Sequence, residues 1–375
     1  MRLLIVDSYY PYFLKSFYKA HPEVKSLPYA GHWQSLMSEC FGTADFYSSN
    51  LKELGHEAHE VIVNNEELQR QWAIENGVKL HFNWFPFDLE RTRLLLKIIH
   101  DQARRFSPDV LYVQSINWLP ADSLKDIKRY VRLIVGQHAS PLPKGRYLQG
   151  YDLILSSLPN QVAYFREQGV ASEYFRLGFE QKVLSKLSKS FPPYDAVHIG
   201  GYSPIHEERN AFLESVSHQV KIDYWGYGMD NVSQGSPIRQ NYHGEAWGIA
   251  MYNIRHNSRI CLNKHITSVA NGFCNNLTLY EATGVGTLLI TDYKGNLPEL
   301  FEPGREVLAY KSPEECSELV KHYLEHEDER LAIAWAGQQR TLREHTYFHR
   351  MQELIDILNR YLHKPQAGTR RIFNS

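Results

Sequence analysis

Residues 275–295 read NNLTLYEATGVGTLLITDYKG, and this stretch indicates how the second half of the chain is built. A polar pair, Asn275-Asn276, precedes a short helical pattern that carries one carboxylate, Glu281. Gly284-Val285-Gly286 then ends the helix, since glycine suits the backbone conformation that follows a helix C-terminus. An apolar run follows and ends at Thr291-Asp292. A helix that leads directly into a buried strand is typical of an α/β domain.

The size and composition of the chain indicate a globular protein of two domains. Its 375 residues exceed the size at which a single hydrophobic core keeps growing. A formal net charge of -1 gives no electrostatic basis for binding nucleic acid. The four cysteines show neither metal-ligand spacing nor a disulfide framework, and no apolar run is long enough to span a bilayer. We therefore expect a cytoplasmic protein with reduced cysteines.

Short apolar runs alternate with helical patterns along both halves of the chain, and the pattern restarts after Phe191-Pro192-Pro193. The predicted strands are 3–6, 61–63, 110–113, 133–135, 153–155, 196–199, 222–225, 259–262, 287–291 and 307–309. The predicted helices include 44–54, 89–106, 160–168, one that begins with a capping box at Ser312, and a last amphipathic helix. This alternation predicts parallel, doubly wound sheets. We expect two Rossmann-like domains, residues 1–180 and residues 181–375, the second with terminal helices.

Loops that follow the strands are the places to look for a ligand, because doubly wound sheets bind ligands beyond the carboxyl ends of their strands. Gly200-Gly201-Tyr202 follows a predicted strand, and Arg209 lies in the next helix. Glycines let a backbone approach a phosphate closely, and an arginine can pair with it through two hydrogen bonds. A Gly-Gly pair at a strand exit is also an ordinary turn. The first strand lacks a G-x-G-x-x-G, which disfavours an NAD enzyme, and no Walker A loop is present.

The opening stretch has a similar pair of interpretations. If Asn276 caps the helix, the free amides of residues 277–279 carry a partial positive charge that suits a diphosphate. Glu281 lies about one turn further along, where its carboxylate can accept hydrogen bonds from the hydroxyls of a ribose. The alternative is that Glu281 is a solvated helix residue and that Gly284 and Gly286 serve close packing.

Several longer motifs carry a resemblance to a known family. LYEATGVGTLLITD, LPELFEPGREVLAY and AGQQRTLREHTYFHR follow one another, with HIGGYSPIHEERNAFLE, WGYG and ICLNKH upstream. In this order they resemble the CgeB-like glycosyltransferases, which belong with the group 1 enzymes of GT-B fold. The similarity covers residues 195–350. The first half resembles GT-B acceptor domains more loosely, through FYSSNLKELGHEAHEVIV, FSPDVLYVQ and YDLILSS.

The resemblance implies two facing Rossmann-like domains, with a nucleotide-diphosphate sugar held mainly by the second. It places Glu281 where the family has its ribose-binding glutamate and Asn276 at the start of the same helix. Arg209 and the Gly200-Gly201-Tyr202 loop match the region that contacts phosphates or the base, and Lys264 is a second candidate for the diphosphate. It also implies sugar transfer without a metal or cofactor, and no Asp-x-Asp triplet is present.

The chain departs from the family pattern at two positions. Phe273 stands where group 1 enzymes have an acidic residue eight positions before the ribose glutamate. Thr278 stands where CgeB-like sequences often have an arginine. The second departure shifts the expected phosphate contacts onto Arg209 and Lys264. His265 is a further candidate for the donor site, with a structural histidine as the alternative.

Sugar transfer requires that the acceptor hydroxyl lose a proton, either to a side chain of the first domain or to the leaving phosphate. His138, in GQHASPLP after a predicted strand, is the preferred candidate for the catalytic base. Asp7, His32 and Glu39 are the other candidates. His138 also fits a structural loop histidine that is satisfied by hydrogen bonds.

Residues 9–33 are unusually aromatic, with Tyr9, Tyr10, Tyr12, Phe13, Phe17, Tyr18, Tyr29 and Trp33. Aromatic faces suit the apolar faces of sugar rings, so the segment could bind the acceptor. A cover over the core and peripheral contact with a membrane surface are the alternatives.

We therefore predict a metal-independent GT-B glycosyltransferase. It would move a sugar from a nucleotide-diphosphate sugar to a hydroxyl of a glycan, lipid-linked or protein acceptor. Two alternatives stay open at this point: a GT-B nucleotide-sugar epimerase or hydrolase, and a non-catalytic subunit that binds a nucleotide sugar.

Overall fold

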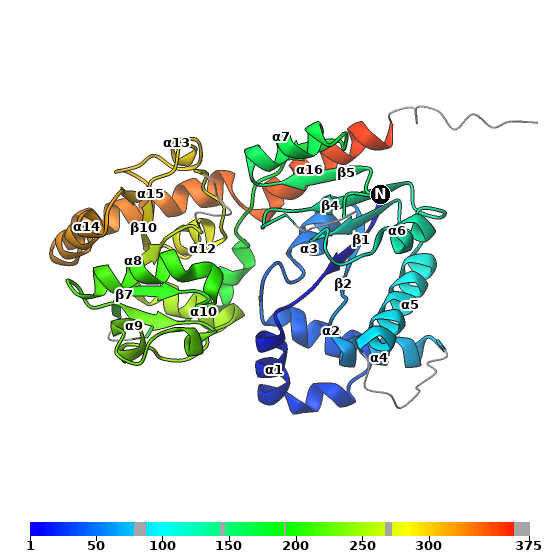
Figure 1. Ribbon diagram of the computed structural model, residues 1–375, viewed down its shortest axis with the longest axis horizontal. Helices are drawn as coiled ribbons and strands as arrows, with labels where there is room; N and C mark the ends of the chain where they lie inside the picture. Colours follow the sequence, from blue (N-terminus) through cyan, green and yellow to red (C-terminus); the bar gives the residue numbers. More distant parts are fainter. Residues whose placement is uncertain (79–87, 143–146, 191–192, 267–271, 364–375) are drawn as a thin grey trace, which may run out of the picture.

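The computed structural model describes residues 1–78, 88–142, 147–190, 193–266 and 272–363, and these residues form two parallel sheets with helices on both faces (Figure 1). The strand order is β2-β1-β3-β4-β5-β6 in the first sheet and β11-β10-β9-β7-β8 in the second. The predicted α/β class with two doubly wound domains is confirmed.

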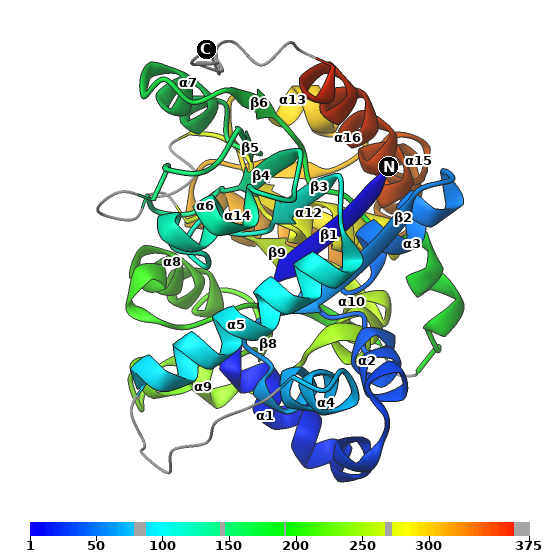
Figure 2. The ribbon, with the colours of Figure 1, turned by 90° about the vertical axis from the view of Figure 1, so that its right-hand side faces the viewer.

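The first domain alternates strands and helices along the chain. Its elements are β1 (Arg2–Asp7), α1 (Pro11–Ala20), η1 (Pro22–Ser26), α2 (Tyr29–Ser38), α3 (Phe46–Glu53), β2 (Glu57–Ile62), α4 (Glu66–Glu75), α5 (Asp88–Phe106), β3 (Val110–Val113), α6 (Ala121–Ile127), β4 (Leu133–Gln137), β5 (Leu153–Ser156), α7 (Pro159–Glu167) and β6 (Ser172–Tyr174). Alternate residues of β1 enter different cores, Leu3 and Ile5 with α3, and Leu4 and Val6 with α5 and α6. Figure 2 shows α5 in front of β1. This two-sided burial explains the continuous apolar runs of the strands.

The second domain repeats this plan. Its elements and those of the linker are η2 (Gln181–Lys186), β7 (Tyr194–Ile199), η3 (Pro204–His206), α8 (Glu207–Ser217), β8 (Asp223–Trp225), η4 (Met229–Asn231), α9 (Pro237–Gln240), α10 (Gly248–His256), β9 (Ser258–Asn263), α12 (Thr278–Gly284), β10 (Leu288–Asp292), α13 (Leu297–Leu300), β11 (Leu308–Tyr310), α14 (Pro313–Glu325), α15 (Glu327–Glu344) and α16 (Tyr347–Leu362). Helices α8 and α14 bury apolar side chains with one face of the sheet, and α10 and α12 with the other.

Most predicted elements are present, and the differences have local causes. All the predicted strands lie within or beside observed ones. Strand β6 was not predicted, because it is short and polar and has no apolar run. Helices α1 and α2 lie in the aromatic segment, for which no helix was predicted. Ser312 caps α14 as predicted, because its Oγ accepts a hydrogen bond from the amide of Glu315 at 3.2 Å.

The last helix does not stay with the second sheet, which corrects the predicted extent of the second domain. Helix α16 crosses back to the first domain and packs against α3 (Figure 1). The ring of Tyr347 lies 5.4 Å from that of Phe46 and 5.5 Å from that of Tyr47. The tail 364–375 and the Phe191-Pro192 pair lie outside the described residues.

Two crossings of the chain connect the domains, and they run side by side. The amide of Phe179, in the first crossing, donates to the carbonyl of His345 at 2.8 Å. The carbonyl of Phe179 accepts from the amide of Tyr347, in the second crossing, at 2.9 Å. The ring of Phe179 lies directly over Gly284, where an added Cβ would be 2.4 Å from the ring. The close approach of Gly284 therefore fixes α12 against the crossing.

Replacing Gly284 with alanine should destabilise the protein, although glycine-to-alanine changes in helices normally stabilise. We expect a loss of about 1–3 kcal/mol in the free energy of unfolding, because the methyl group overpacks the contact with Phe179. Chemical denaturation followed by tryptophan fluorescence measures it. Gly235→Ala is the matched control, since nothing lies within 4 Å of its added Cβ. Equal stabilities of the two variants would contradict the packing account.

Candidate active site

The topology of each sheet marks one crevice. In the second sheet the strand order reverses between β7 and β9, so the crevice lies at the carboxyl ends of these strands. It is bordered by the Gly200-Gly201 loop and by Lys264. In the first sheet the order reverses between β1 and β3, beside Asp7 and Gln114. Gly200, Gly201 and Lys264, which the sequence suggested for the donor site, therefore lie at the crevice that binds ligands in folds of this type.

Arg209 is a buried cation at this crevice. Its guanidinium donates a hydrogen bond to the carbonyl of Gly201, and its Nε has no hydrogen-bond partner within the described residues. No described carboxylate forms an ion pair with it. Burial lowers the pKa of Arg209 to about 10. Burial, together with the charge of Arg209, lowers the pKa of His198 to about 3 and that of His206 to about 4. The positive charge is therefore left uncompensated by its surroundings.

Glycines make the loop beside Arg209 compact. Gly226 has φ of +136°, and an added Cβ there would lie 1.6 Å from the carbonyl oxygen of Gly200. An added Cβ at Gly201 would lie 2.6 Å from Cζ of Tyr227. The loops after β7 and β8 are thus in direct backbone contact. Gly226 was not singled out from the sequence as a site residue, although it lies in the quoted WGYG motif.

Tyr202 requires a correction. Its side chain is fully buried, and its hydroxyl donates to the carbonyl of Trp225 at 3.2 Å. The side chain therefore belongs to the core beneath the loop, and a contact between it and a donor is incompatible with this burial.

Lys264 adds a second positive charge near the same loop. Its Nζ lies 3.4 Å from a carboxylate oxygen of Glu208 and 5.2 Å from the centre of the Phe212 ring. Glu208 is 65% exposed, so this ion pair contributes little. Because Glu208 precedes Arg209 in α8, both cations belong to one small region.

The predicted role of Asn276 as a helix cap is wrong. Helix α12 spans Thr278–Gly284, its N-cap is Leu277, and no side chain caps it. Instead, Nδ2 of Asn276 donates to Oδ1 of Asn263 at 2.7 Å, which ties the start of α12 to the end of β9. The helix is short, so the case for the diphosphate rests on Arg209 and Lys264.

Glu281 is buried, so the alternative that it is a solvated helix residue is wrong. Its carboxylate forms an ion pair with Arg255 of α10 and accepts a hydrogen bond from the hydroxyl of Tyr252 at 3.4 Å. Burial alone would lower the pKa of Arg255, but the charge of Glu281 and smaller contributions from Cys261, Tyr252 and the hydrogen bond to Glu281 together raise that pKa. Arg255 also donates to Oγ1 of Thr278 at 3.4 Å. Arg255 thus connects α10 to the start of α12 as well as to Glu281.

His265 is held by an aspartate. Its amide and Nδ1 both lie near Oδ1 of Asp292, at 3.0 and 2.7 Å. Burial alone would raise the pKa of Asp292, but hydrogen bonds and charge from His265, with the charge of Lys294, lower it to about 2. Nε2 of His265 is buried and has no partner within the described residues.

The loop of His138 touches the second domain. The carbonyl of Ala139 accepts a hydrogen bond from Nδ2 of Asn275 at 3.1 Å. His138 itself is 2% exposed, and its Nε2 lies 3.4 Å from Oγ of Ser140. Burial lowers the pKa of its imidazole. His138 therefore lies next to a contact between the two domains, and its ring is buried.

Asp7 lies at the crevice of the first sheet and is half-buried. Its carboxylate accepts hydrogen bonds from the amide of Ser8 at 2.7 Å and from Oγ1 of Thr43 at 3.0 Å. Burial raises its pKa to about 6. A carboxylate with this pKa can accept a proton near neutral pH.

The other two candidates for the base are engaged elsewhere. His32 is buried, and its Nε2 lies 2.8 Å from the hydroxyl of Tyr18. Glu39 lies 3.4 Å from a ring nitrogen of His21, and its carbonyl accepts a hydrogen bond from the amide of Ile249 in the second domain at 2.8 Å. Both therefore have structural contacts that account for them.

The first part of the aromatic segment bridges the two domains. Tyr12 stacks on Tyr227 of the second domain with ring centres 5.6 Å apart, and Tyr10 lies 5.4 Å from the same ring. Phe41 lies 5.4 Å from Trp247, which stacks on Tyr227 at 5.5 Å. These contacts connect the loops after β1 and β8, so the segment is more than a cover over the first core.

The second part of the segment lines a separate cavity of about 520 Å³. Tyr29 and Trp33 lie on its wall with His59, and Lys182 and Lys186 lie on the linker side. A role of these aromatic residues in acceptor binding stays a prediction.

Residues 208–356 match a family model described as glycosyl transferase-like, which spans the helix of Arg209, the ion pair of Glu281 and most of α16. This match, in the second half of the chain, supports a group 1 glycosyltransferase. The CgeB-like subtype stays a prediction.

Solved structures show the same fold as this glycosyltransferase. HepE from Anabaena, solved with UDP-glucose, is 13% identical with a TM-score of 0.62, and the match covers 96% of this chain and 100% of HepE. A glycosyltransferase from Rickettsia africae is 12% identical with a TM-score of 0.60, over 97% and 99% of the two chains. Sucrose-phosphate synthase from Thermosynechococcus elongatus is 8% identical with a TM-score of 0.60, over 96% and 99%. These likenesses confirm the GT-B fold. No curated protein sequence matches the chain.

In the part of this glycosyltransferase that the structure describes, no helix combines the length and the apolar character needed to cross a membrane. Contact with a membrane surface and the cellular location stay predictions.

Arg255 was missed from the sequence, because nothing in its own segment shows that it pairs with a glutamate 26 residues away.

The ion pair between Arg255 and Glu281 should show strong coupling in a double-mutant cycle. Glu281→Ala or Arg255→Ala alone leaves one buried charge unpaired, which costs about 3–5 kcal/mol. The double variant should lose far less than the sum of the two. Urea denaturation of the four proteins measures the coupling. The exposed pair Arg305 and Glu302, 3.0 Å apart, is the control and should show little coupling. Additive losses at Arg255 and Glu281 would contradict the buried pair.

Proposed function

We propose that this glycosyltransferase transfers a sugar from a nucleotide-diphosphate sugar to an acceptor hydroxyl without a metal ion. The observation that carries this proposal is the uncompensated charge of Arg209. Burying a cation without a counter-ion is unfavourable, so such groups mark functional sites more often than chance. A diphosphate bound beside the Gly200-Gly201 loop supplies the missing negative charge.

The same charges account for the chemistry. When the glycosidic bond to the diphosphate breaks, negative charge builds on the leaving phosphate. Arg209 and Lys264, held in place before the reaction, stabilise this charge where a metal ion does so in other enzymes. Glu281, fixed by Arg255, accepts hydrogen bonds from the ribose hydroxyls of the nucleotide.

The acceptor hydroxyl binds on the side of the first domain. Asp7 is the stronger candidate for the base, because it lies at the crevice of the first sheet and its pKa is raised to about 6. His138, the candidate preferred from the sequence, is the competitor. The acceptor is a carbohydrate-containing molecule or a protein. Since HepE was solved with UDP-glucose, uridine nucleotides are the first donors to test.

Arg209→Met separates a ligand-binding arginine from a structural one. We expect the variant to lose the thermal stabilisation that UDP gives, with affinity reduced about 30-fold or more, because the counter-ion of the diphosphate is gone. Without nucleotide its melting temperature should equal or exceed that of the wild type, since an unpaired buried charge is removed.

Arg255→Met is the matched control, because it removes a buried arginine that has a carboxylate partner and should lower the melting temperature. Thermal stabilisation by a panel of UDP, GDP, ADP, CDP and TDP identifies the preferred nucleobase. Repeating the panel with EDTA tests metal independence. If Arg209→Met keeps the UDP shift, or if EDTA abolishes the shift in the wild type, the proposal fails. Binding without turnover would support the non-catalytic alternative.

The dependence of the transfer rate on pH identifies the base. If Asp7 is the base, kcat/KM should fall as the pH drops through about 6, because the carboxylate becomes protonated. Asp7→Asn should then lose about 100-fold or more in kcat while its UDP affinity is kept. In His138→Ala, kcat/KM should still fall as the pH drops through about 6; this fall is the acidic limb of the pH profile. Loss of turnover in His138→Ala, with the limb kept in Asp7→Asn, would assign the base to His138.

A further inference from the structure

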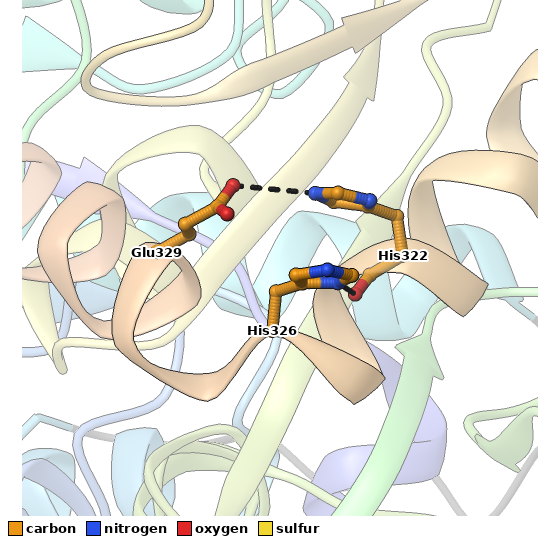
Figure 3. A group of neighbouring side chains, drawn as sticks. All are labelled: His322, His326 and Glu329. Carbon is orange, nitrogen blue, oxygen red and sulfur yellow. Dashed lines mark hydrogen bonds and ion pairs between the residues drawn. The ribbon is translucent and has the colours of Figure 1, made fainter.

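Two histidines and a glutamate converge at the turn between α14 and α15 (Figure 3). His322 lies in the last turn of α14, His326 joins the two helices, and Glu329 lies in the first turn of α15. All three side chains are exposed, and one nitrogen or oxygen of each lies within 4.8 Å of the others. Imidazole nitrogens with a carboxylate are a ligand set that suits Zn²⁺.

The spacing of His322 and Glu329 already fits a metal ion. Nε2 of His322 lies 3.2 Å from Oε2 of Glu329. In a tetrahedral zinc site the ligand atoms lie about 2.0–2.2 Å from the ion, so two of them are about 3.3–3.5 Å apart. An ion can therefore bind both atoms with little movement. The ligand atoms of all three residues lie within 4.8 Å of one another, so the third needs only a small movement of exposed side chains to reach the ion.

The third ligand is oriented by its own hydrogen bond. Nδ1 of His326 lies 2.7 Å from the carbonyl oxygen of His322. A carbonyl oxygen can only accept, so Nδ1 carries the proton and Nε2 keeps its lone pair. The two imidazole rings are stacked with centres 3.9 Å apart and planes at 12° (Figure 3). Stacking keeps both rings beside the glutamate.

We propose that His322, His326 and Glu329 bind one Zn²⁺ ion, with water in the remaining position. The site lies at the end of the second domain that is remote from the first (Figure 1), so the ion takes no part in sugar transfer. It fastens α14 to the start of α15. Helix α15 packs on α12, and Oγ1 of Thr341 lies 2.6 Å from Oγ1 of Thr283. The ion therefore stabilises a helix that supports the donor domain.

Isothermal titration calorimetry of tag-free protein with zinc chloride tests this site. We expect one equivalent to bind with a dissociation constant of about 1–10 µM, weaker than a four-ligand structural site. The melting temperature should rise with zinc concentration. Affinity should fall at acidic pH, because protons compete for the imidazoles.

Variants of exposed residues make the test specific, since they should leave the fold intact. His322→Ala and His326→Ala should lose saturable binding, and Glu329→Gln should weaken it about tenfold or more. His218→Ala, another exposed histidine of the second domain, should bind zinc as the wild type does. Absence of saturable binding in the wild type overturns the proposal. Binding that survives in His326→Ala, or disappears in His218→Ala, overturns it as well.

Discussion

The account of this protein depends on one buried positive charge. Arg209 lies at the crevice of the second sheet with no acidic partner within the described residues, and its closest histidines have pKa values too low to carry charge at neutral pH. Within the described residues its guanidinium donates a hydrogen bond only to a backbone carbonyl, that of Gly201. The fold tolerates this charge because tight contact between glycine loops holds the carbonyl of Gly201 in place. An uncompensated buried charge indicates a functional site, and binding of an anionic ligand is the simplest function that explains it.

A second buried arginine in the same domain shows the contrast. Arg255 is almost inaccessible, but its charge is matched by Glu281. The pair holds the carboxylate of Glu281 in one position, one turn from the start of α12. The same chain therefore contains one arginine whose partner is supplied by the protein and one whose partner is left to a ligand. This division separates the group that positions a donor-site residue from the group that binds the diphosphate.

The fold could be predicted from the sequence because its signals are local. Strands with two buried faces appear as apolar runs, and glycine or proline marks the helix ends. The site was predictable only in part. Lys264 directly follows a strand end at the crevice, and Arg209 lies in the helix that comes after another strand end, so local patterns reveal both.

Features of the site and the fold that depend on contacts between residues far apart in sequence were not predictable. The burial of Tyr202 beneath its loop, the bond of Asn276 to Asn263, the return of α16 to the first domain and the pairing of Arg255 are all of this kind. A single sequence specifies such contacts only through the folded chain.

A crystal structure of the protein with UDP tests the central claim most directly. The account predicts that a β-phosphate oxygen lies within hydrogen-bond distance of the guanidinium of Arg209, beside Gly200-Gly201, with no metal ion between them. A diphosphate bound elsewhere, with Arg209 still facing only the carbonyl of Gly201, would contradict it.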